Sequence, residues 1–276
     1  MVTERAGAER TIYTTALSDQ WDALARLVTG LDETRWRTPT ALPGWTVFDV
    51  LAHVIGVEAM LLGEPTPQHD ADLSALAHVH NEIGALNEAW VAALRPLTGE
   101  QLLARFTEIT GRRRTMLTDM TDEQWETPAP SPVGNVPYAR FMRVRLFDCW
   151  MHELDIADAL GVTVDEGGPR AEIAFAEITA TLGRAAVKGA QAPDGSRITF
   201  SLTGPAARRL HLQVDGRANL VEELDAPAAV TVELPCGLFA RLRGGRTTAA
   251  EHSDEITVTG DRDLGNRLAD TLRYTI

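Results

Sequence analysis

The hydrophobic pattern of this chain changes its period once, close to Gly189, and that change limits the folds available to it. Before this point apolar residues recur at intervals of three and four, the spacing of helices that bury one face. Beyond it the segments RITFSL, RRLHLQV and AAVTVEL alternate apolar and polar residues, as half-buried strands do. The length of 276 residues also favours two domains over one. We therefore predict a helical domain over residues 1–188 and a small α+β domain over residues 189–276.

The elements expected within each domain follow from the same pattern. In the first domain, helices are predicted over residues 8–28, 46–62, 70–94, 98–120 (interrupted near Gly111), 138–160 and 169–187. Thr46 and Asp49 form a capping-box pattern, and the stretch TPAPSPVGNVP is predicted to be a long loop. In the second domain, CGLFARLRGG predicts a short helix, EITVTG a further strand, and residues 261–274 a terminal helix capped by Asp261.

Charge and composition exclude several classes of partner. A net charge of −13 and a pI near 5.0 argue against nucleic acid and against an anionic membrane surface. No apolar run approaches the roughly 18 residues that span a bilayer, and the opening stretch MVTERAGAERTIYTT lacks the apolar region of a signal peptide. The two cysteines, Cys149 and Cys236, do not provide a disulfide framework. We therefore expect a cytoplasmic monomer or homodimer that acts on a small molecule.

Candidate metal ligands gather in the stretch RLFDCWMHELDIADAL. Asp148 and His152 are four residues apart on a predicted helix, so their side chains share a face. A surface ion pair is the more common explanation of this spacing alone, but the apolar residues around the pair favour a place inside the bundle. His53 lies in a second apolar helix, TVFDVLAHVIGVEAMLL, where a buried histidine can also be a simple core residue. Together the three side chains predict a site with one open position, as in catalytic zinc centres.

The neighbours of these residues are given lesser roles. Asp155, one helical turn beyond His152, is expected either to orient the imidazole by a hydrogen bond or to fix the helix to a neighbour. Glu153 is predicted to be solvated, and Cys149 to be a small core residue. His78 and His80 lie two residues apart and would face different directions on a helix, so we do not expect them to bind metal.

Two segments of the sequence resemble those of a known protein family. LPGWTVFDVLAHVIGVEAML and RVRLFDCWMHELDIADALG resemble the two characteristic segments of the mycothiol-dependent maleylpyruvate isomerase family, a branch of the DinB-like four-helix metalloproteins. The segment VTVELPCGLFARLRGGR, with EITVTGDRDLGNRLADTL, looks like the second domain of that family, whose topology is similar to sterol carrier proteins. The resemblance implies a DinB-like four-helix bundle followed by a sterol-carrier-like α+β domain.

The resemblance also implies a ligand set, a cofactor and a chemistry. It carries the metal ligands over to His53, Asp148 and His152, with Zn²⁺ or another divalent ion, although the family leads us to expect glutamate where this chain has Asp148. The thiol cosubstrate would be mycothiol, the small thiol of actinobacteria, and the presence of 25 arginines against one lysine fits a GC-rich source of that kind. The metal-bound thiolate would attack a small electrophile, giving S-transfer or cis–trans isomerisation of a maleylpyruvate-like substrate, and we favour S-transfer.

One substrate-binding residue is implied as well. The family's second domain contributes an arginine to the site, and Arg246 in LRGGR is the candidate here, with a solvated surface position as its alternative.

Two other functions remain open from the sequence. The first is a non-catalytic module that binds a hydrophobic small molecule and keeps the metal for structure only. The second is a metal-dependent hydrolase, for which only Asp155 or Glu58 would be placed to act as general base. Glu58 lies about 140° around the helix from His53, which disfavours the hydrolase.

Overall fold

The structure, a computed structural model, describes residues 2–274 and groups the chain into two compact units. These units are Met1–Val164, which is mainly helical, and Asp165–Ile276, which is built on a five-stranded sheet. The predicted order of a helical domain followed by an α+β domain is therefore confirmed. The division falls earlier than the predicted boundary at 188/189. Helix α8 (Gly168–Thr179) belongs to the second unit because its Phe175 stacks on Phe239 there, with the ring centroids 6.3 Å apart.

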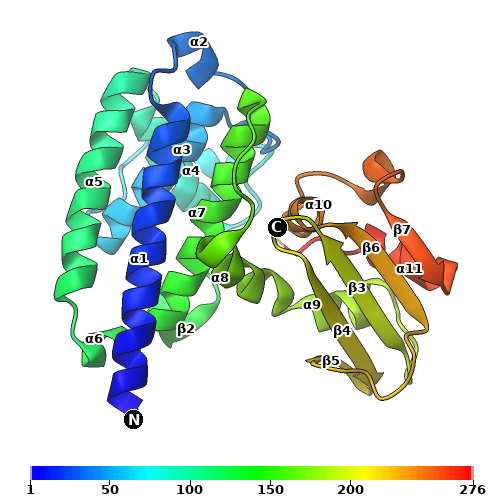
Figure 1. The fold of residues 1–276 in the computed structure, drawn as a ribbon. Coiled ribbons are helices and arrows are strands. Elements are labelled where there is room, and N and C mark those ends of the chain that lie inside the picture. Colours follow the sequence, from blue (N-terminus) through cyan, green and yellow to red (C-terminus); the bar gives the residue numbers. More distant parts are fainter. Residues whose placement is uncertain (1, 275–276) are drawn as a thin grey trace. The chain divides into compact units, whose positions relative to one another are not determined.

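Four long helices form the bundle of the first unit (Figure 1). They are α1 (Val2–Val28), α3 (Val47–Leu61), α5 (Gly99–Asp119) and α7 (Tyr138–Leu160). Each packs against two of the others, in the order α1, α5, α3, α7 and back to α1, which closes the ring. Helix α3 is buried from Val47 to Ala59, and its start is fixed by the predicted capping box between Thr46 and Asp49. Helix α7 ends as predicted at Gly161, which adopts a left-handed conformation with φ of 64°.

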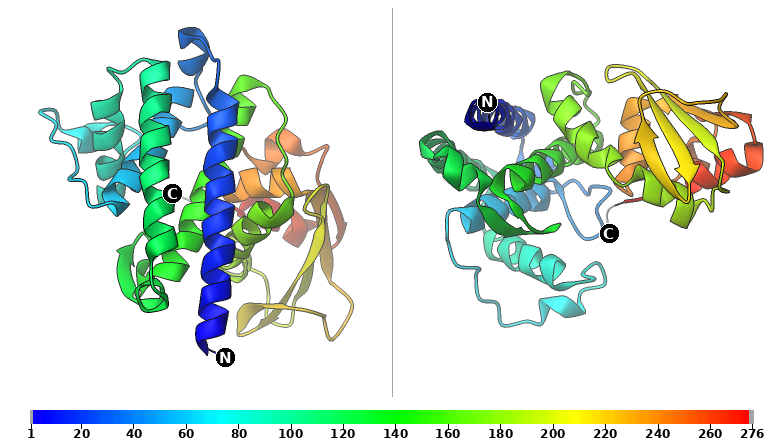
Figure 2. Two further views of the ribbon diagram at one scale, coloured as in Figure 1. Left: turned by 60° about the vertical axis from the view of Figure 1, so that its left-hand side comes forward. Right: turned by 90° about the horizontal axis from the view of Figure 1, so that it is seen from below.

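Helix α4 (Glu82–Leu94) lies outside this ring and packs on α3 (Figure 2). The close approach depends on Gly56, since a Cβ atom added there would lie 2.5 Å from Trp90 Cβ. The helix begins later than predicted because Asn81 accepts a hydrogen bond from the Gly84 backbone and caps it. Ahead of it the chain forms only a short 3₁₀ turn, η1 (Leu73–Ala75).

The remaining elements of the first unit differ in part from the sequence prediction. Helix α5 runs through Gly111 without interruption, and the predicted loop TPAPSPVGNVP forms a two-stranded hairpin. Elements not anticipated are α2 (Glu33–Trp36), α6 (Asp122–Glu126), β1 (Pro128–Ser131) and β2 (Gly134–Pro137).

The second unit is a sheet with helices on one face (Figure 1). Its strand order is β5-β4-β3-β6-β7, with β3 and β6 parallel and the other neighbours antiparallel. The strands are β3 (Arg197–Thr203), β4 (Arg208–Asp215), β5 (Arg217–Val221), β6 (Val230–Pro235) and β7 (Thr257–Gly260). The helical segments after α8 are α9 (Leu182–Arg184), η2 (Ala185–Gly189), α10 (Cys236–Arg243), η3 (Ala249–His252) and α11 (Arg262–Asp270).

Alternation of apolar residues along the strands builds the core of this unit. Phe200 on β3 pairs in register with Val232 on β6, and both side chains are fully buried beneath the helices. Phe239 of α10 packs edge-on against Phe200, with the ring centroids 5.7 Å apart. Strand β5 was the one strand of this sheet that the sequence did not predict.

Across the part of the chain that the structure describes, no helix is long and apolar enough to cross a bilayer.

Candidate metal centre

Three side chains from two helices of the bundle converge at one point. His53 on α3 and Asp148 and His152 on α7 each offer a ligand atom, and these atoms lie within 4.8 Å of one another. His53 Nε2 lies 3.4 Å from Asp148 Oδ2, and His152 Nε2 lies 3.5 Å from Asp148 Oδ1. Among residues 2–274, no other group of three or more such side chains comes this close together. The structure thus brings together the three residues that the sequence singled out.

Helix α7 holds His152 by a charged hydrogen bond. The Nδ1 atom of His152 lies 2.9 Å from Asp155 Oδ2, and both side chains are buried. Burial alone would lower the pKa of His152, but the carboxylates of Asp148 and Asp155 outweigh it and raise the pKa to about 9. Asp155 therefore plays the orienting role expected for it, and the Nε2 atom of His152 is turned toward Asp148.

His53 is held differently, in apolar surroundings on α3. Its ring lies 5.2 Å from the ring of Trp45 and 4.9 Å, edge to face, from the ring of His152. Burial is the largest influence on its pKa and lowers it, although the nearby Asp148 carboxylate acts in the opposite direction. His53 is therefore a neutral imidazole at neutral pH, which is the form that binds metal.

A buried chain of charges continues from Asp148 into the bundle. Arg145 donates to Asp148 Oδ2 at 2.6 Å and to Glu58 Oε1 at 2.8 Å, and Arg113 donates to Glu58 Oε2 at 2.8 Å. Arg145, Glu58 and Arg113 are all almost completely buried. Partial burial would raise the pKa of Asp148, but His152 and Arg145 hold it well below the usual range. Asp148 is thus a carboxylate at neutral pH.

The same network removes Glu58 as a general base. Burial would raise the pKa of this carboxyl group, but Arg145 and Arg113 outweigh it and lower the pKa. A fully buried carboxylate held by two guanidinium groups is a weak base. The structure therefore gives the hydrolase alternative no support from Glu58.

For two further residues of α7, the predicted burial is right in one case and wrong in the other. Cys149 is a fully buried core residue as predicted, and burial raises the pKa of its thiol to about 12. Glu153 was predicted to be solvated, and that prediction is wrong. It is 3% exposed and accepts a hydrogen bond of 2.6 Å from Gln20 of α1, so it faces the neighbouring helix.

The other histidines do not join the centre. His78 lies outside any helix, and its Nε2 atom is 3.1 Å from Glu88 Oε2 on α4. His80 is exposed. Neither belongs to the group of His53, Asp148 and His152.

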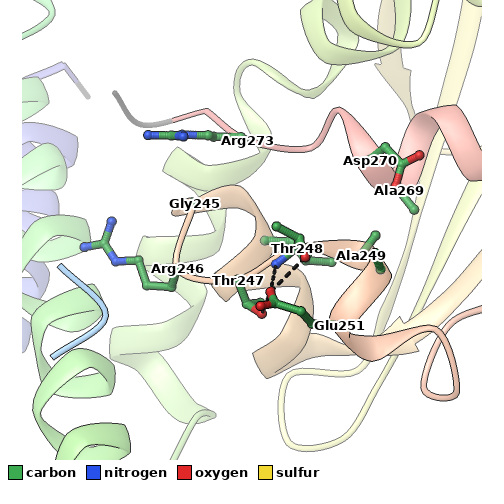
Figure 3. Close-up of a pocket in the computed structure, with 11 residues that line it drawn as sticks. Gly245, Arg246, Thr247, Thr248, Ala249, Glu251, Ala269, Asp270 and Arg273 are labelled. Carbon is green, nitrogen blue, oxygen red and sulfur yellow. Dashed lines mark hydrogen bonds between the residues drawn. The ribbon is translucent and has the colours of Figure 1, made fainter. Parts of the chain in front are cut away.

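Arg246 lines a pocket of about 380 Å³ within the second unit (Figure 3). The guanidinium of Arg246 donates to the Gly244 carbonyl at 2.6 Å, and Arg273 lines the same pocket. Thr248 and Glu251 on the opposite side are joined by hydrogen bonds of 2.8 and 2.9 Å. The carboxylates of Glu251 and Asp270 line the pocket as well, so it carries two guanidinium groups and two acids.

The donor set of the first unit fits a divalent metal ion. Two imidazole nitrogens and one carboxylate, all from rigid helices, are the ligands found in catalytic zinc sites that keep a further position for a substrate or water. The hydrogen bond to Asp155 engages Nδ1 of His152 and leaves Nε2 as the ligand atom, which would release its proton when an ion binds. The side chain of Asp148 is 32% exposed, so the centre is open to solvent on one side.

Comparison with known proteins places the chain in a family. The model of the mycothiol maleylpyruvate isomerase N-terminal domain matches residues 17–157, and the model of the C-terminal domain of the same family matches residues 172–267. The chain belongs to the mycothiol maleylpyruvate isomerase family. The resemblance seen in the sequence is confirmed.

Solved structures of this family share the fold. The crystal structure of the mycothiol-dependent maleylpyruvate isomerase matches with a TM-score of 0.59 and 18% identity over 92% of both chains. A histidine-to-alanine mutant of that isomerase matches with a TM-score of 0.56 at the same identity and coverage. The predicted combination of helical bundle and α+β domain is therefore the fold of the maleylpyruvate isomerase family.

The curated relatives carry no functional description. Uncharacterized proteins from two strains of Mycobacterium tuberculosis are 31% identical over 150 residues, or 53% of this chain. The chain spans about half the length of the curated relatives it matches.

Proposed function

We propose that this protein is a metal-dependent enzyme that uses mycothiol as a thiol cosubstrate for attack on a small electrophile. The observation that carries the proposal is the convergence of His53, Asp148 and His152 within a fold of the maleylpyruvate isomerase family. The solved relative is described as mycothiol-dependent and as an isomerase of maleylpyruvate, which supports both the thiol and the substrate class.

His53, Asp148 and His152 would hold the ion, and zinc is the ion that we propose from the donor set. A bound divalent ion would favour the thiolate form of a thiol whose free pKa is about 8.5. The protein's own residues prepare the site for that role. Asp155 fixes the ring of His152, and Arg145 fixes the carboxylate of Asp148.

The nucleophile is assigned to the cosubstrate because the chain offers no suitable thiol. Cys149 follows Asp148 in α7, but it is fully buried, lies against Arg145 at 3.3 Å, and burial raises its pKa to about 12. At neutral pH such a side chain is a protonated core residue. Cys236, in the second unit, is buried as well. A small thiol that enters from solvent would reach the centre on the exposed side of Asp148.

The substrate would be an anionic electrophile, and Arg246 is the proposed binding residue for its carboxylate. Support for this role is the placement of Arg246 with a second guanidinium, Arg273, at a pocket that two acids and two threonines also line. S-transfer and cis–trans isomerisation begin with the same attack of the thiolate on the electrophile, and they differ in whether the adduct persists. We favour S-transfer, and the substrate panel below separates the two outcomes.

The first test is the metal content of the purified protein. We expect about one divalent ion per chain, and its loss in His53→Ala and in His152→Ala, because each removes one of three ligands. His80→Ala is the matched control, since His80 is exposed and outside the centre. Full metal occupancy in both ligand variants would overturn the proposed site.

The second test is the thiol dependence of turnover. The protein is assayed with mycothiol, using maleylpyruvate and a panel of alkylating electrophiles as substrates. S-transfer should consume the thiol, whereas isomerisation should form the isomer without loss of thiol. Equal turnover with and without mycothiol would contradict the thiol mechanism. Binding of a small apolar ligand that survives metal chelation, with no turnover, would support a non-catalytic binding module instead.

A further inference from the structure

The two histidines of the metal centre are oriented by different means. The Nδ1 atom of His152 is fixed by the carboxylate of Asp155 at 2.9 Å. The Nδ1 atom of His53 is buried, and no atom among residues 2–274 forms a hydrogen bond with it. The torsion that turns a histidine ring has broad minima, so a ring without such a bond needs another restraint to keep one orientation. The Nε2 atom of His53 does lie 3.4 Å from Asp148 Oδ2, but Nε2 is the atom that would bind the ion. A restraint that leaves Nε2 free for the ion must therefore come from ring packing.

Trp45 provides the contact that can serve as this restraint. It comes directly before the Thr46 cap of α3, and its ring centroid lies 5.2 Å from that of His53 with 36° between the planes. The ring of His152 contacts His53 from another side, edge to face at 4.9 Å. Aromatic contacts of this kind are attractive beyond the area that they bury and depend on ring geometry, so they can select one ring orientation.

The indole of Trp45 is itself held in place by a buried acid. Its Nε1 atom donates to Glu88 Oε2 on α4 at 2.9 Å, and Glu88 is completely buried. Arg95 pairs with the other carboxylate oxygen of Glu88 at 2.8 Å, and His78 lies 3.1 Å from the same oxygen as Trp45. Glu88 is therefore anchored from two sides independently of Trp45, so it presents a fixed acceptor to the indole.

The loop before α3 is shaped to make this contact. Gly44, next to Trp45, has φ of +79°, a conformation that favours glycine. A Cβ atom on Gly44 would lie 2.7 Å from His78 Nδ1, so a side chain there would displace His78 from Glu88. The glycine thus allows the loop, His78 and Glu88 to pack together beside Trp45.

From these contacts we propose that Trp45, held by Glu88, is the positioning residue for His53. It does for the α3 ligand what Asp155 does for the α7 ligand, but through ring packing in place of a charged hydrogen bond. The proposal rests on the proposed metal site at His53, Asp148 and His152. It adds a role for the loop and for α4, neither of which supplies a ligand.

The test compares metal affinity with fold stability in three variants. Trp45→Leu removes both the ring and the indole N–H, and it leaves Glu88 paired with Arg95 and His78, so the unit should still fold. We expect Zn²⁺ affinity, measured by titration against a chelator, to fall by about 10- to 100-fold, as for other residues that orient metal ligands. Trp45→Phe keeps a ring but loses the hydrogen bond to Glu88, and its loss of affinity should be smaller.

The control is Trp125→Phe, at a fully buried tryptophan of the same unit that packs against Tyr13 and Tyr138. It should lower the melting temperature of the metal-free protein and leave Zn²⁺ affinity unchanged. The visible spectrum of the Co²⁺-loaded protein adds a direct view of ligand geometry and should change in Trp45→Leu only. A merely structural role for Trp45 predicts lower stability with unchanged affinity and spectrum, and that result would overturn the proposal.

Failure of the proposed function and failure of this inference give different results. If the wild-type protein binds no Zn²⁺, the metal site itself is wrong. If the wild type binds and Trp45→Leu binds equally well, only the role of Trp45 is wrong. The metal-free protein provides a further readout by NMR of the histidine rings. We expect one sharp set of His53 signals in the wild type and exchange-broadened signals in Trp45→Leu, whereas sharp signals in both would contradict the proposal.

Discussion

The two helices that supply the candidate ligands differ in how they stabilise them. On α7, charged partners surround the ligands, with Arg145 on Asp148 and Asp155 on His152. On α3, His53 lies among apolar residues and aromatic rings. As a result burial lowers the pKa of His53, whereas the carboxylates near His152 overcome burial and raise its pKa. Two chemically identical ligands thus differ in protonation before any ion binds, and the following predictions test that difference.

The largest effect on stability is expected when the buried ion network of Arg145, Glu58 and Arg113 is disrupted. Arg145→Met would leave Glu58 paired with Arg113 and would remove the 2.6 Å contact of Asp148. We expect the free energy of unfolding to fall by about 3–5 kcal/mol in urea denaturation, as when one member of a buried ion network is removed. Arg112→Met is the control, because Arg112 pairs with Glu64 near the surface and should change stability by less than about 1 kcal/mol. Equal losses in the two variants would contradict a special role for the buried network.

The second prediction concerns the pH dependence of stability in the metal-free protein. His152 has a pKa of about 9 in the folded state against an ordinary value of 6.5, so its contribution is complete below pH 6.5 and is lost as the pH rises toward 9. His53 has a lowered pKa, so its neutral form in the fold costs stability as the pH falls below 6.5. We expect stability from this pair to be highest near pH 6.5, with a loss of about 3 kcal/mol on the alkaline side.

Single variants separate the two slopes. His152→Gln should flatten the alkaline loss, and His53→Gln should flatten the acid loss, both measured as unfolding free energy against pH. A His152→Gln variant that keeps the full alkaline loss would show that another group causes it.

The third prediction tests the orienting carboxylate. Asp155→Asn removes the charge that faces His152 Nδ1 and should weaken Zn²⁺ binding by at least about tenfold. It should also lower the pKa of His152 in the metal-free protein, which NMR titration would measure. Asp158→Asn, on the same helix but exposed, is the control and should change neither quantity. If Asp155→Asn binds Zn²⁺ as tightly as the wild type, the charged hydrogen bond does not orient His152, and the proposed difference between the two histidines is wrong.

The smallest effect is expected from lengthening the acid ligand. Asp148→Glu restores the residue that the family resemblance led us to expect at this position. Because the side chain of Asp148 is 32% exposed, there is room for one more methylene, and Zn²⁺ affinity should change by less than about tenfold. A loss as large as that of His53→Ala would show that Arg145 and the site fit the shorter acid only.

Local spacing made the α7 half of the centre predictable. Residues four apart on a helix must share a face, so the convergence of Asp148 and His152 followed from their numbers alone. The start of α4 at Glu82 carried a local signal too, since Asn81 is a common capping residue, but the periodicity of the preceding segment hid it.

Long-range pairing was not predictable in this way. Glu153 was expected in solvent because its partner, Gln20, is 133 residues away and leaves no mark on the α7 sequence. The same holds for Arg145 and Glu58, which are 87 residues apart. The hairpin of β1 and β2 was missed because prolines predict loops, although they are tolerated in edge strands.

The separation of the ligands along the chain has a consequence for how the fold opens. His53 and Asp148 are 95 residues apart, and α4 and α5 lie between them. An ion held by both would act as a cross-link that closes this whole segment into a loop, and the entropy of the open chain would fall accordingly. Removal of the ion by a chelator should therefore speed amide exchange and proteolysis across the enclosed helices, well beyond the ligands themselves.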